Sequence, residues 1–189
     1  DIAGKPYYQA MFDVFIGAEP DGKPSFKLGV LESAEPDASG KVWTLILKKG
    51  LRWHDGVEMT SQDTKFSLEY LARPESRGVS GAFLKANLDR VEIADTYTAK
   101  VYLKNTNFSF PVVLGNTEGD LAILRKHHFE KMGADNFDKN PLGSGPWKFV
   151  NWVAGTRLDL EANENYWGEI PKFKNLIVLN IPEMSTKVA

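Results

Sequence analysis

Cysteine is absent from this chain of 189 residues, and its absence excludes thiol catalysis, disulfide bonds and thiolate metal sites. No run of about 18 or more apolar residues occurs, so the sequence predicts no transmembrane helix. The first residues, DIAGKPYY, also lack the basic start and apolar centre of a signal peptide. We therefore expect either a protein that is not exported or a chain that begins after a processed end.

The chain also lacks an excess of charge of either sign. Its 23 Lys and Arg residues nearly balance 25 Asp and Glu residues, and the basic residues are scattered rather than gathered in a stripe. This pattern argues against nucleic acid as a partner. Aromatic residues are plentiful at 12%, and such rings can build a core or line a ligand cleft.

Apolar spacing and turn signals predict an α+β domain with several antiparallel hairpins and no internal repeat. Residues 6–18 have helical spacing, residues 42–49 alternate as a strand does, and residues 73–87 are rich in loop formers. The other expected elements are a short helix or strand at 26–33, two strands within 89–104, a buried segment broken by Pro at 108–116, a strand running into a helix at 121–133, a hairpin at 148–163, a strand at 173–183 and a first helical turn at 184–189. A helix beginning at Ser185 has too few residues to be stable alone, which indicates a piece of a longer protein.

The stretch GLRWHDGVEMTSQDTKFSLEYL, residues 50–71, places His54 beside Asp55, as an acid–base pair or a metal site could. Neighbouring side chains on an extended turn point in different directions, and no third ligand lies at a useful spacing. Asp-Gly supplies the positive φ of a tight turn. Thr60 and Asp63 then have the spacing of a capping box that opens a helix. We interpret the motif as a structural turn, although this interpretation leaves the choice of His54 unexplained.

Other candidate groups also favour structural interpretations. His127 and His128 diverge by about 100° on a helix, so they do not share a metal easily. Ser144 has no evident base as a nucleophile, and the chain has no nucleotide-binding or hydrolase fingerprint. The aromatic clusters could line a cleft or fill the core, and they are Tyr7-Tyr8, Trp147, Trp152 and Tyr166-Trp167.

Two separated motifs together resemble a known family. The stretch VWTLILKKGLRWHDGVEMTSQDTKFSLEY closely resembles the signature of the family 5 extracellular solute-binding proteins, the peptide- and nickel-binding receptors of ABC importers. The stretch NPLGSGPWKFVNWVAGTRLDLEANENYWG resembles the second signature. The matching residues are Trp53, Asp55, Gly56, Thr60, Asp63, Phe66 and Ser67 in the first motif, and Asn140, Pro141, Gly143, Gly145, Pro146, Tyr166, Trp167 and Gly168 in the second.

The resemblance implies part of lobe I of a periplasmic-binding-protein-like, type II fold, with a mixed sheet, antiparallel hairpins and packed helices. It covers residues 1–189 as a partial lobe, without the second lobe and the C-terminal return. Family members capture a solute by closing two lobes and deliver it to a membrane permease. They work in the periplasm or outside the cell, catalyse no reaction, and need no cofactor or metal of their own.

The resemblance implies an oligopeptide as the first choice of ligand, while sugars, nickel chelates and opines are other ligands of the family. In relatives, the ligand meets this half of the protein just before the first helix and in the loop after the signature helix. The implied ligand-binding residues are Ile2, Ala3, Gly4, Ser80, Gly81, Ala82 and Phe83.

One alternative from another class is a stand-alone interaction or scaffold module that kept the lobe fold without a working cleft. An enzyme is a third, less favoured hypothesis. We expect an isolated chain of this length to bind solute at a millimolar dissociation constant at best. We also expect it to self-associate, because the surface that normally meets the rest of the lobe is exposed.

Overall fold

A four-stranded sheet forms one end of the molecule in the computed structural model, which describes residues 8, 10–115 and 121–180. Every strand in it pairs antiparallel with its neighbours. In spatial order its strands are β3 (Leu31–Pro36), β4 (Val42–Leu47), β6 (Thr98–Leu103) and β5 (Leu88–Ile93). Trp43, Leu45 and Leu47 alternate inward from β4, as the sequence predicts.

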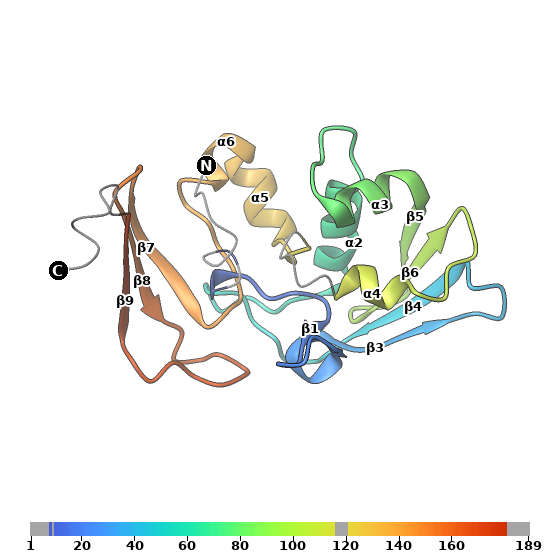
Figure 1. Ribbon diagram of the computed structural model, residues 1–189, viewed down its shortest axis with the longest axis horizontal. Helices are drawn as coiled ribbons and strands as arrows, with labels where there is room; N and C mark the ends of the chain where they lie inside the picture. Colours follow the sequence, from blue (N-terminus) through green and yellow to red (C-terminus); the bar gives the residue numbers. More distant parts are fainter. Residues whose placement is uncertain (1–7, 9, 116–120, 181–189) are drawn as a thin grey trace.

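Helices cover one face of this sheet (Figure 1). They are α2 (Ser61–Leu71), α3 (Val79–Asn87) and α4 (Phe110–Leu114). The expectation of a loop across residues 73–87 was wrong for α3, because Leu84 is fully buried and secures this helix against the sheet despite its glycines. Pro111 does not break its segment either. It lies in the first turn of α4, where a missing N–H costs no helical hydrogen bond.

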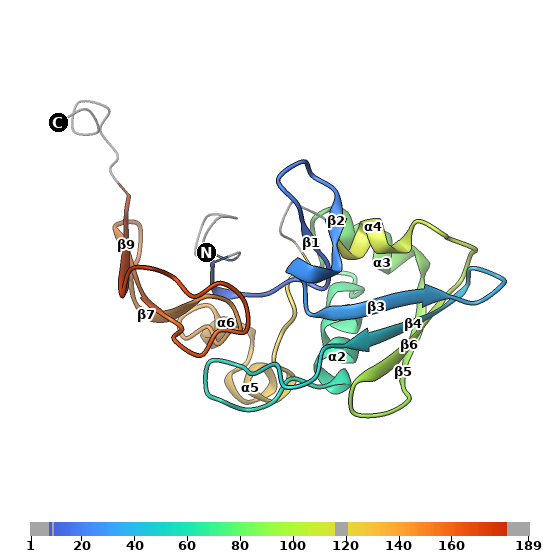
Figure 2. The ribbon, with the colours of Figure 1, turned by 90° about the horizontal axis from the view of Figure 1, so that it is seen from below.

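A three-stranded antiparallel sheet lies at the opposite end of the long axis (Figures 1 and 2). Its strands are β7 (Trp147–Val153), β8 (Arg157–Ala162) and β9 (Asn175–Leu179). The predicted hairpin at 148–163 and the strand within 173–183 are confirmed. Two short helices lie between the sheets, namely α5 (Lys126–Met132) and α6 (Ala134–Phe137). The expected helical turn at 184–189 falls outside the described residues.

The segment of residues 10–18 runs between the two sheets (Figure 2). The prediction of a helix over residues 6–18 was wrong beyond Met11, where helical conformation ends. Neighbouring segments hydrogen-bond to its carbonyl groups instead: Ile123 N–H donates to Asp13 O at 3.0 Å, and Val30 N–H donates to Val14 O at 3.0 Å. These tertiary bonds hold the chain extended where the apolar spacing alone favours a helix.

Short elements complete the region beside this segment. They are β1 (Gly17–Ala18), its antiparallel partner β2 (Pro24–Ser25), and the 3₁₀ helix η1 (Phe26–Leu28), which precedes β3. Residues 26–33, for which the sequence left helix and strand open, therefore form a short helix followed by the start of a strand.

The interior consists of two apolar clusters. The larger lies between the four-stranded sheet and its helices, and includes Phe110 and Val101, both fully buried. The smaller joins the three-stranded sheet to the middle of the molecule through Phe12, Phe129 and Leu160. Burial of these side chains is the main force that keeps the three-stranded sheet attached to the rest of the chain.

The turn at residues 54–56 has the predicted form. Gly56 has φ of 83°, and Asp63 closes a capping box with Thr60 at the start of α2. The Thr60 backbone N–H donates to the Asp63 carboxylate at 3.0 Å. The first motif is therefore a strand, a tight turn and a capped helix.

We predict that Gly56→Val lowers the free energy of unfolding by about 1–2 kcal/mol, because a β-branched residue resists positive φ. Beyond the neighbouring residues in the chain, no heavy atom of the described residues lies within 4 Å of the Cβ that a substitution at Gly56 would add, so the cost is conformational rather than steric. Gly56→Asn is the matched variant and loses less, since Asn visits this region more readily. Denaturant unfolding measures both, and equal stability of Gly56→Val and the unchanged protein would refute the turn assignment.

Candidate functional site

His54 joins the two sequence motifs. Its backbone N–H donates to Gly143 O at 2.9 Å, and its ring Nε2 lies 2.9 Å from Gly145 O. A carbonyl oxygen only accepts, so Nε2 carries the proton and donates. Burial lowers the pKa of His54 to about 4, and the nearby Lys148 charge also lowers it. A neutral imidazole thus fastens the turn of the first motif to the loop of the second, which supplies the missing reason for His54.

The Gly-Ser-Gly loop lies against the segment between the sheets. Gly145 N–H donates to Met11 O at 2.9 Å. A Cβ on Gly143 would lie 1.9 Å from Met11 O, and one on Gly145 would lie 2.7 Å from the Met11 carbonyl carbon. The two glycines are therefore required by close approach of one backbone to another.

Asp13 is the central polar group of this junction and is only 6% exposed. Its carboxylate accepts from the Tyr166 hydroxyl at 2.8 Å and from Trp167 Nε1 at 3.1 Å. Desolvation raises the pKa of Asp13, while the hydrogen bonds from Trp167 and Tyr166 act in the opposite direction. The pKa of Tyr166 is raised by its own burial and by the Asp13 charge, so its hydroxyl stays a donor.

Lys48 lies over the indole ring of Trp167. Its Nζ is 4.3 Å from the centroid of the indole ring and donates to Phe26 O at 2.8 Å and Gly29 O at 2.6 Å. Desolvation lowers the pKa of Lys48, and the Asp13 charge partly offsets that effect. The carboxylate, the two aromatic residues and the ammonium group form one network, which we call the Asp13 network and define as Asp13, Lys48, Tyr166 and Trp167.

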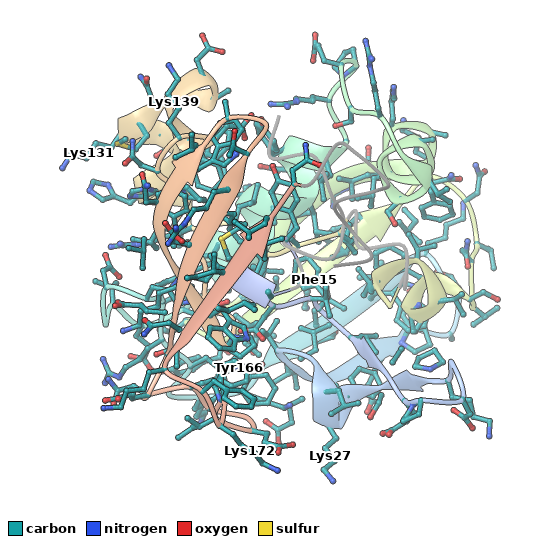
Figure 3. All side chains as sticks on the ribbon, turned by 60° about the vertical axis from the view of Figure 1, so that its left-hand side comes forward. Phe15, Lys27, Lys131, Lys139, Tyr166 and Lys172 are labelled. Atoms are coloured by element: carbon teal, nitrogen blue, oxygen red, sulfur yellow. The ribbon has the colours of Figure 1, made fainter. Side chains whose placement is uncertain are left out.

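A hollow of about 410 Å³ opens beside the Asp13 network. It is large enough for a small ligand or for part of a larger one. Figure 3 shows Tyr166 on the loop after β8, with Phe15 further inward on the segment between the sheets. The lining residues are Phe12, Asp13, Val14, Ile16, Gly17, Ala18, Leu28, Gly115, Pro146 and Tyr166. Because the hydrogen bonds of Asp13 are made to the protein itself, the carboxylate shapes this wall.

The predicted ligand-binding residues divide into two groups. Ile2, Ala3 and Gly4 lie outside the described residues. Ser80, Gly81, Ala82 and Phe83 all lie on α3, where the first two are buried and Ala82 is exposed. Phe83 stacks on Phe110, with ring centroids 6.2 Å apart. The structure does not bring this group beside the hollow at Asp13, since none of the four lines it.

Of the remaining candidates, Asp55 and His128 have structural partners, while His127 is exposed. Asp55 pairs with Arg125, away from the His54 ring. His127 is exposed on α5, while His128 hydrogen-bonds to Asn140 O at 3.1 Å, so the two rings diverge as predicted. Of the aromatic residues, Trp147 and Trp152 pack against the smaller apolar cluster.

Sequence reasoning missed Asp13. The available signal was a lone carboxylate within the apolar run MFDVFIG, because a charge in such a run is buried only with partners. Within residues 8, 10–115 and 121–180, no group of three or more His, Asp or Glu side chains is placed to hold a metal ion. Over that same part of the chain, no helix has the length and apolar character to cross a membrane.

The architecture and both motifs agree with known proteins. The family model described as "Bacterial extracellular solute-binding proteins, family 5 Middle" matches residues 25–189, and the chain therefore belongs to this family. Its structural neighbours have the type II periplasmic-binding-protein fold, which confirms the predicted fold class.

Individual relatives are similar over nearly the whole chain. The oligopeptide-binding protein AppA of Bacillus subtilis is 30% identical over 175 residues, which is 89% of this chain and 32% of AppA. The structure of AppA with a nonapeptide has a TM-score of 0.81 at 26% identity, over 99% of this chain and 37% of that one. The chain thus spans about a third of the length of this relative.

Two further solved structures are similar at 25% identity. NikZ of Campylobacter jejuni, in complex with Ni(L-His), has a TM-score of 0.82 and matches 95% of this chain and 35% of that one. AgaA of A. tumefaciens R10, in complex with agropinic acid, has a TM-score of 0.84 and matches 97% and 36%, respectively. One fold thus carries ligands of very different chemistry in these relatives.

We predict that Tyr166→Phe lowers the free energy of unfolding by about 1.5–3 kcal/mol, because it removes a hydrogen bond to a buried carboxylate. Tyr102→Phe is the matched control, since its hydroxyl donates to Glu92 at 2.9 Å on the surface. The control should change stability by less than about 0.5 kcal/mol. Denaturant unfolding of both variants measures these losses. Equal losses of unfolding free energy would show that burial of Asp13 does not strengthen the hydrogen bond from Tyr166.

A second prediction concerns pH. The pKa of His54 is about 4 in the folded protein, against about 6.5 in an unfolded chain, so the unfolded state binds more protons between these values. Stability that is present above pH 6.5 is therefore lost as the pH falls toward 4, by about 2–3 kcal/mol.

His54→Gln tests this pH dependence, because it keeps an N–H donor for Gly145 O without titrating. The variant should lose less stability between pH 7.5 and pH 4.5 than the unchanged protein, while the exposed His127→Gln should behave like the unchanged protein. Identical acid dependence with and without His54 would rule out the role given to its ring.

Proposed function

We propose that this chain is part of a receptor that captures a solute, in the first place an oligopeptide, for an ABC-type importer. Membership of the solute-binding family supports solute capture. The 30% identity to an oligopeptide-binding protein, over 89% of the chain, supports peptide as the solute. The single observation that carries the proposal is the hollow beside the Asp13 network, which is lined in part by residues between Phe12 and Ala18.

The hollow has the mixed lining expected for one part of a peptide-binding site. Its walls combine apolar side chains, such as Ile16 and Leu28, with the polar side chains of Asp13 and Tyr166. Such walls accept varied side chains while offering hydrogen bonds to a peptide backbone. We propose that Ile2, Ala3 and Gly4 also contact the solute.

The stretch on α3 has a smaller role in the proposal. Ser80 is 1% exposed and Gly81 is buried, so neither offers a surface to a solute. Ala82 and Phe83 are the two residues of the stretch that remain candidates for contact.

Capture requires more than this chain supplies. The chain spans about a third of the AppA length, and we propose that a further lobe closes over the solute and excludes water. The receptor then works in the periplasm or outside the cell and passes its solute to a permease. The charged groups at the junction hold the wall in place, and we assign them no catalytic role.

A substitution tests the position of the hollow. In the full-length receptor, Ala18→Trp should weaken solute binding at least tenfold, because the indole occupies space in the hollow that Ala18 lines. Ala154→Trp is the control, since Ala154 is exposed in the turn between β7 and β8. Isothermal calorimetry measures the affinity of both variants. Unchanged affinity in a folded Ala18→Trp receptor would show that the solute does not bind in this hollow.

A ligand screen tests the choice of solute. An oligopeptide at 100 times its dissociation constant should stabilise the full-length receptor by about 2.7 kcal/mol in thermal unfolding. Stabilisation by sugars or by a nickel–histidine chelate, without any by peptides, would contradict the peptide assignment and leave solute capture in place. The absence of stabilisation by every class of solute would contradict solute capture itself.

A further inference from the structure

A second hollow, of about 420 Å³, lies where the turn of the first motif meets the loop after β8. Among the described residues, Tyr166 alone lines both this hollow and the one beside Asp13. Arg52 lines it from just before the turn at residues 54–56, His54 lines it from that turn, Lys148 lines it from β7, and Asn165 and Trp167 line it from the loop after β8. It is a different hollow from the proposed solute site, and the family comparison assigns it no role.

Two cationic side chains in this hollow lack carboxylate partners. Arg52 Nη1 donates to Gly56 O at 2.7 Å, and among the described residues its guanidinium forms no ion pair. Lys148 stands across the strand pair from Glu161, yet within the described part of the chain these two form no ion pair either. The remaining donors of both groups are therefore available to a ligand.

Among the residues that the structure describes, none that lines the hollow carries a carboxylate. Two acidic residues lie close to Arg52 in the sequence: the Asp55 carboxylate pairs with Arg125, and the Glu58 carboxylate accepts from Gly50 N–H at 3.3 Å and from the Tyr97 hydroxyl at 2.8 Å. Two like charges at one concave surface, without a counter-charge, raise the local concentration of anions. Lys and Arg are also the groups that proteins use to bind phosphate and carboxylate, and a guanidinium can donate two parallel hydrogen bonds.

The walls of the hollow are held in place before any ligand arrives. Trp53 is 2% exposed, and the buried Asn163 donates through Nδ2 to Gly145 O at 3.2 Å. His54 donates to the same carbonyl, which fixes the turn that carries Arg52. A preformed wall lowers the ordering cost of binding.

From these observations we infer that the hollow between Arg52 and Lys148 binds a small oxyanion, with a carboxylate or phosphate group held by both cations. Asn165 lies beside them as an uncharged polar group, and the Trp167 ring offers an apolar wall for the remainder of the ligand. Free phosphate and the phosphate of a lipid headgroup share this chemistry.

Inorganic phosphate is the first probe, titrated into the full-length receptor at constant ionic strength with selective ¹⁵N-histidine labelling. The His54 ring signals should shift saturably, with a dissociation constant of about 0.1–1 mM, while those of His127 and His128 stay fixed. Lys148→Gln should weaken binding severalfold, and Arg52→Gln with Lys148→Gln at least tenfold. Lys148→Arg should retain binding, and so should Lys172→Gln, because Lys172 lies on the outer loop (Figure 3) and does not line the hollow.

Vesicles distinguish the two sources of phosphate. One outcome is that the receptor co-sediments with phosphatidylglycerol vesicles but not with phosphatidylcholine vesicles. If the double variant loses this binding, the site belongs to a lipid headgroup. Phosphate binding without vesicle binding would assign it to a free anion. Shifts of the same size in the double variant and the unchanged receptor, or of the same size at all three histidines, would show an ionic-strength effect and overturn the proposal. The absence of any shift in the folded receptor would also overturn it.

Discussion

The buried carboxylate of Asp13 is the constraint on which the junction between the two sheets depends. A charge that is 6% exposed is tolerable only with donors around it, and Tyr166 and Trp167 supply them from a loop more than 150 residues away in the chain. This requirement fixes the loop after β8 against the segment between the sheets. Lys48 then packs on Trp167, which ties the four-stranded sheet to the same point.

The two sequence motifs contact each other and hold the same junction together. The turn at residues 54–56 and the Gly-Ser-Gly loop meet through His54, and the loop meets Met11 because its glycines have no side chains. The hollow proposed for the solute and the hollow proposed for an oxyanion share Tyr166 as a lining residue. The geometry of each therefore rests on the same few polar contacts.

Local signals in the sequence were sufficient for much of the fold. Alternation predicts β4, Asp-Gly predicts the turn at Gly56, and Ala154-Gly155 predicts the hairpin of β7 and β8. Each of these is determined by neighbouring residues, so the chain within a few positions contains the necessary information. The motif resemblance added the family and the type II fold, which no local pattern provides.

Long-range contacts explain what could not be predicted. Residues 12–18 are extended because backbone groups near Val30 and Ile123 bind their carbonyl oxygens, and helix α3 forms because Leu84 finds a place in the core. The role of Asp13 was missed for the same reason, since its partners are close only in the folded chain. Helix propensity and apolar spacing carry no information about such partners.

The central claim is that the Asp13 network shapes the wall against which a captured peptide lies. A crystal structure of the full-length receptor with a bound oligopeptide tests this claim most directly. We predict ligand atoms within about 4 Å of the segment from Val14 to Ala18, with the Tyr166 hydroxyl still bound to Asp13. A peptide held entirely by other surfaces, or an Asp13 carboxylate that leaves Tyr166 to bind the ligand, would contradict it.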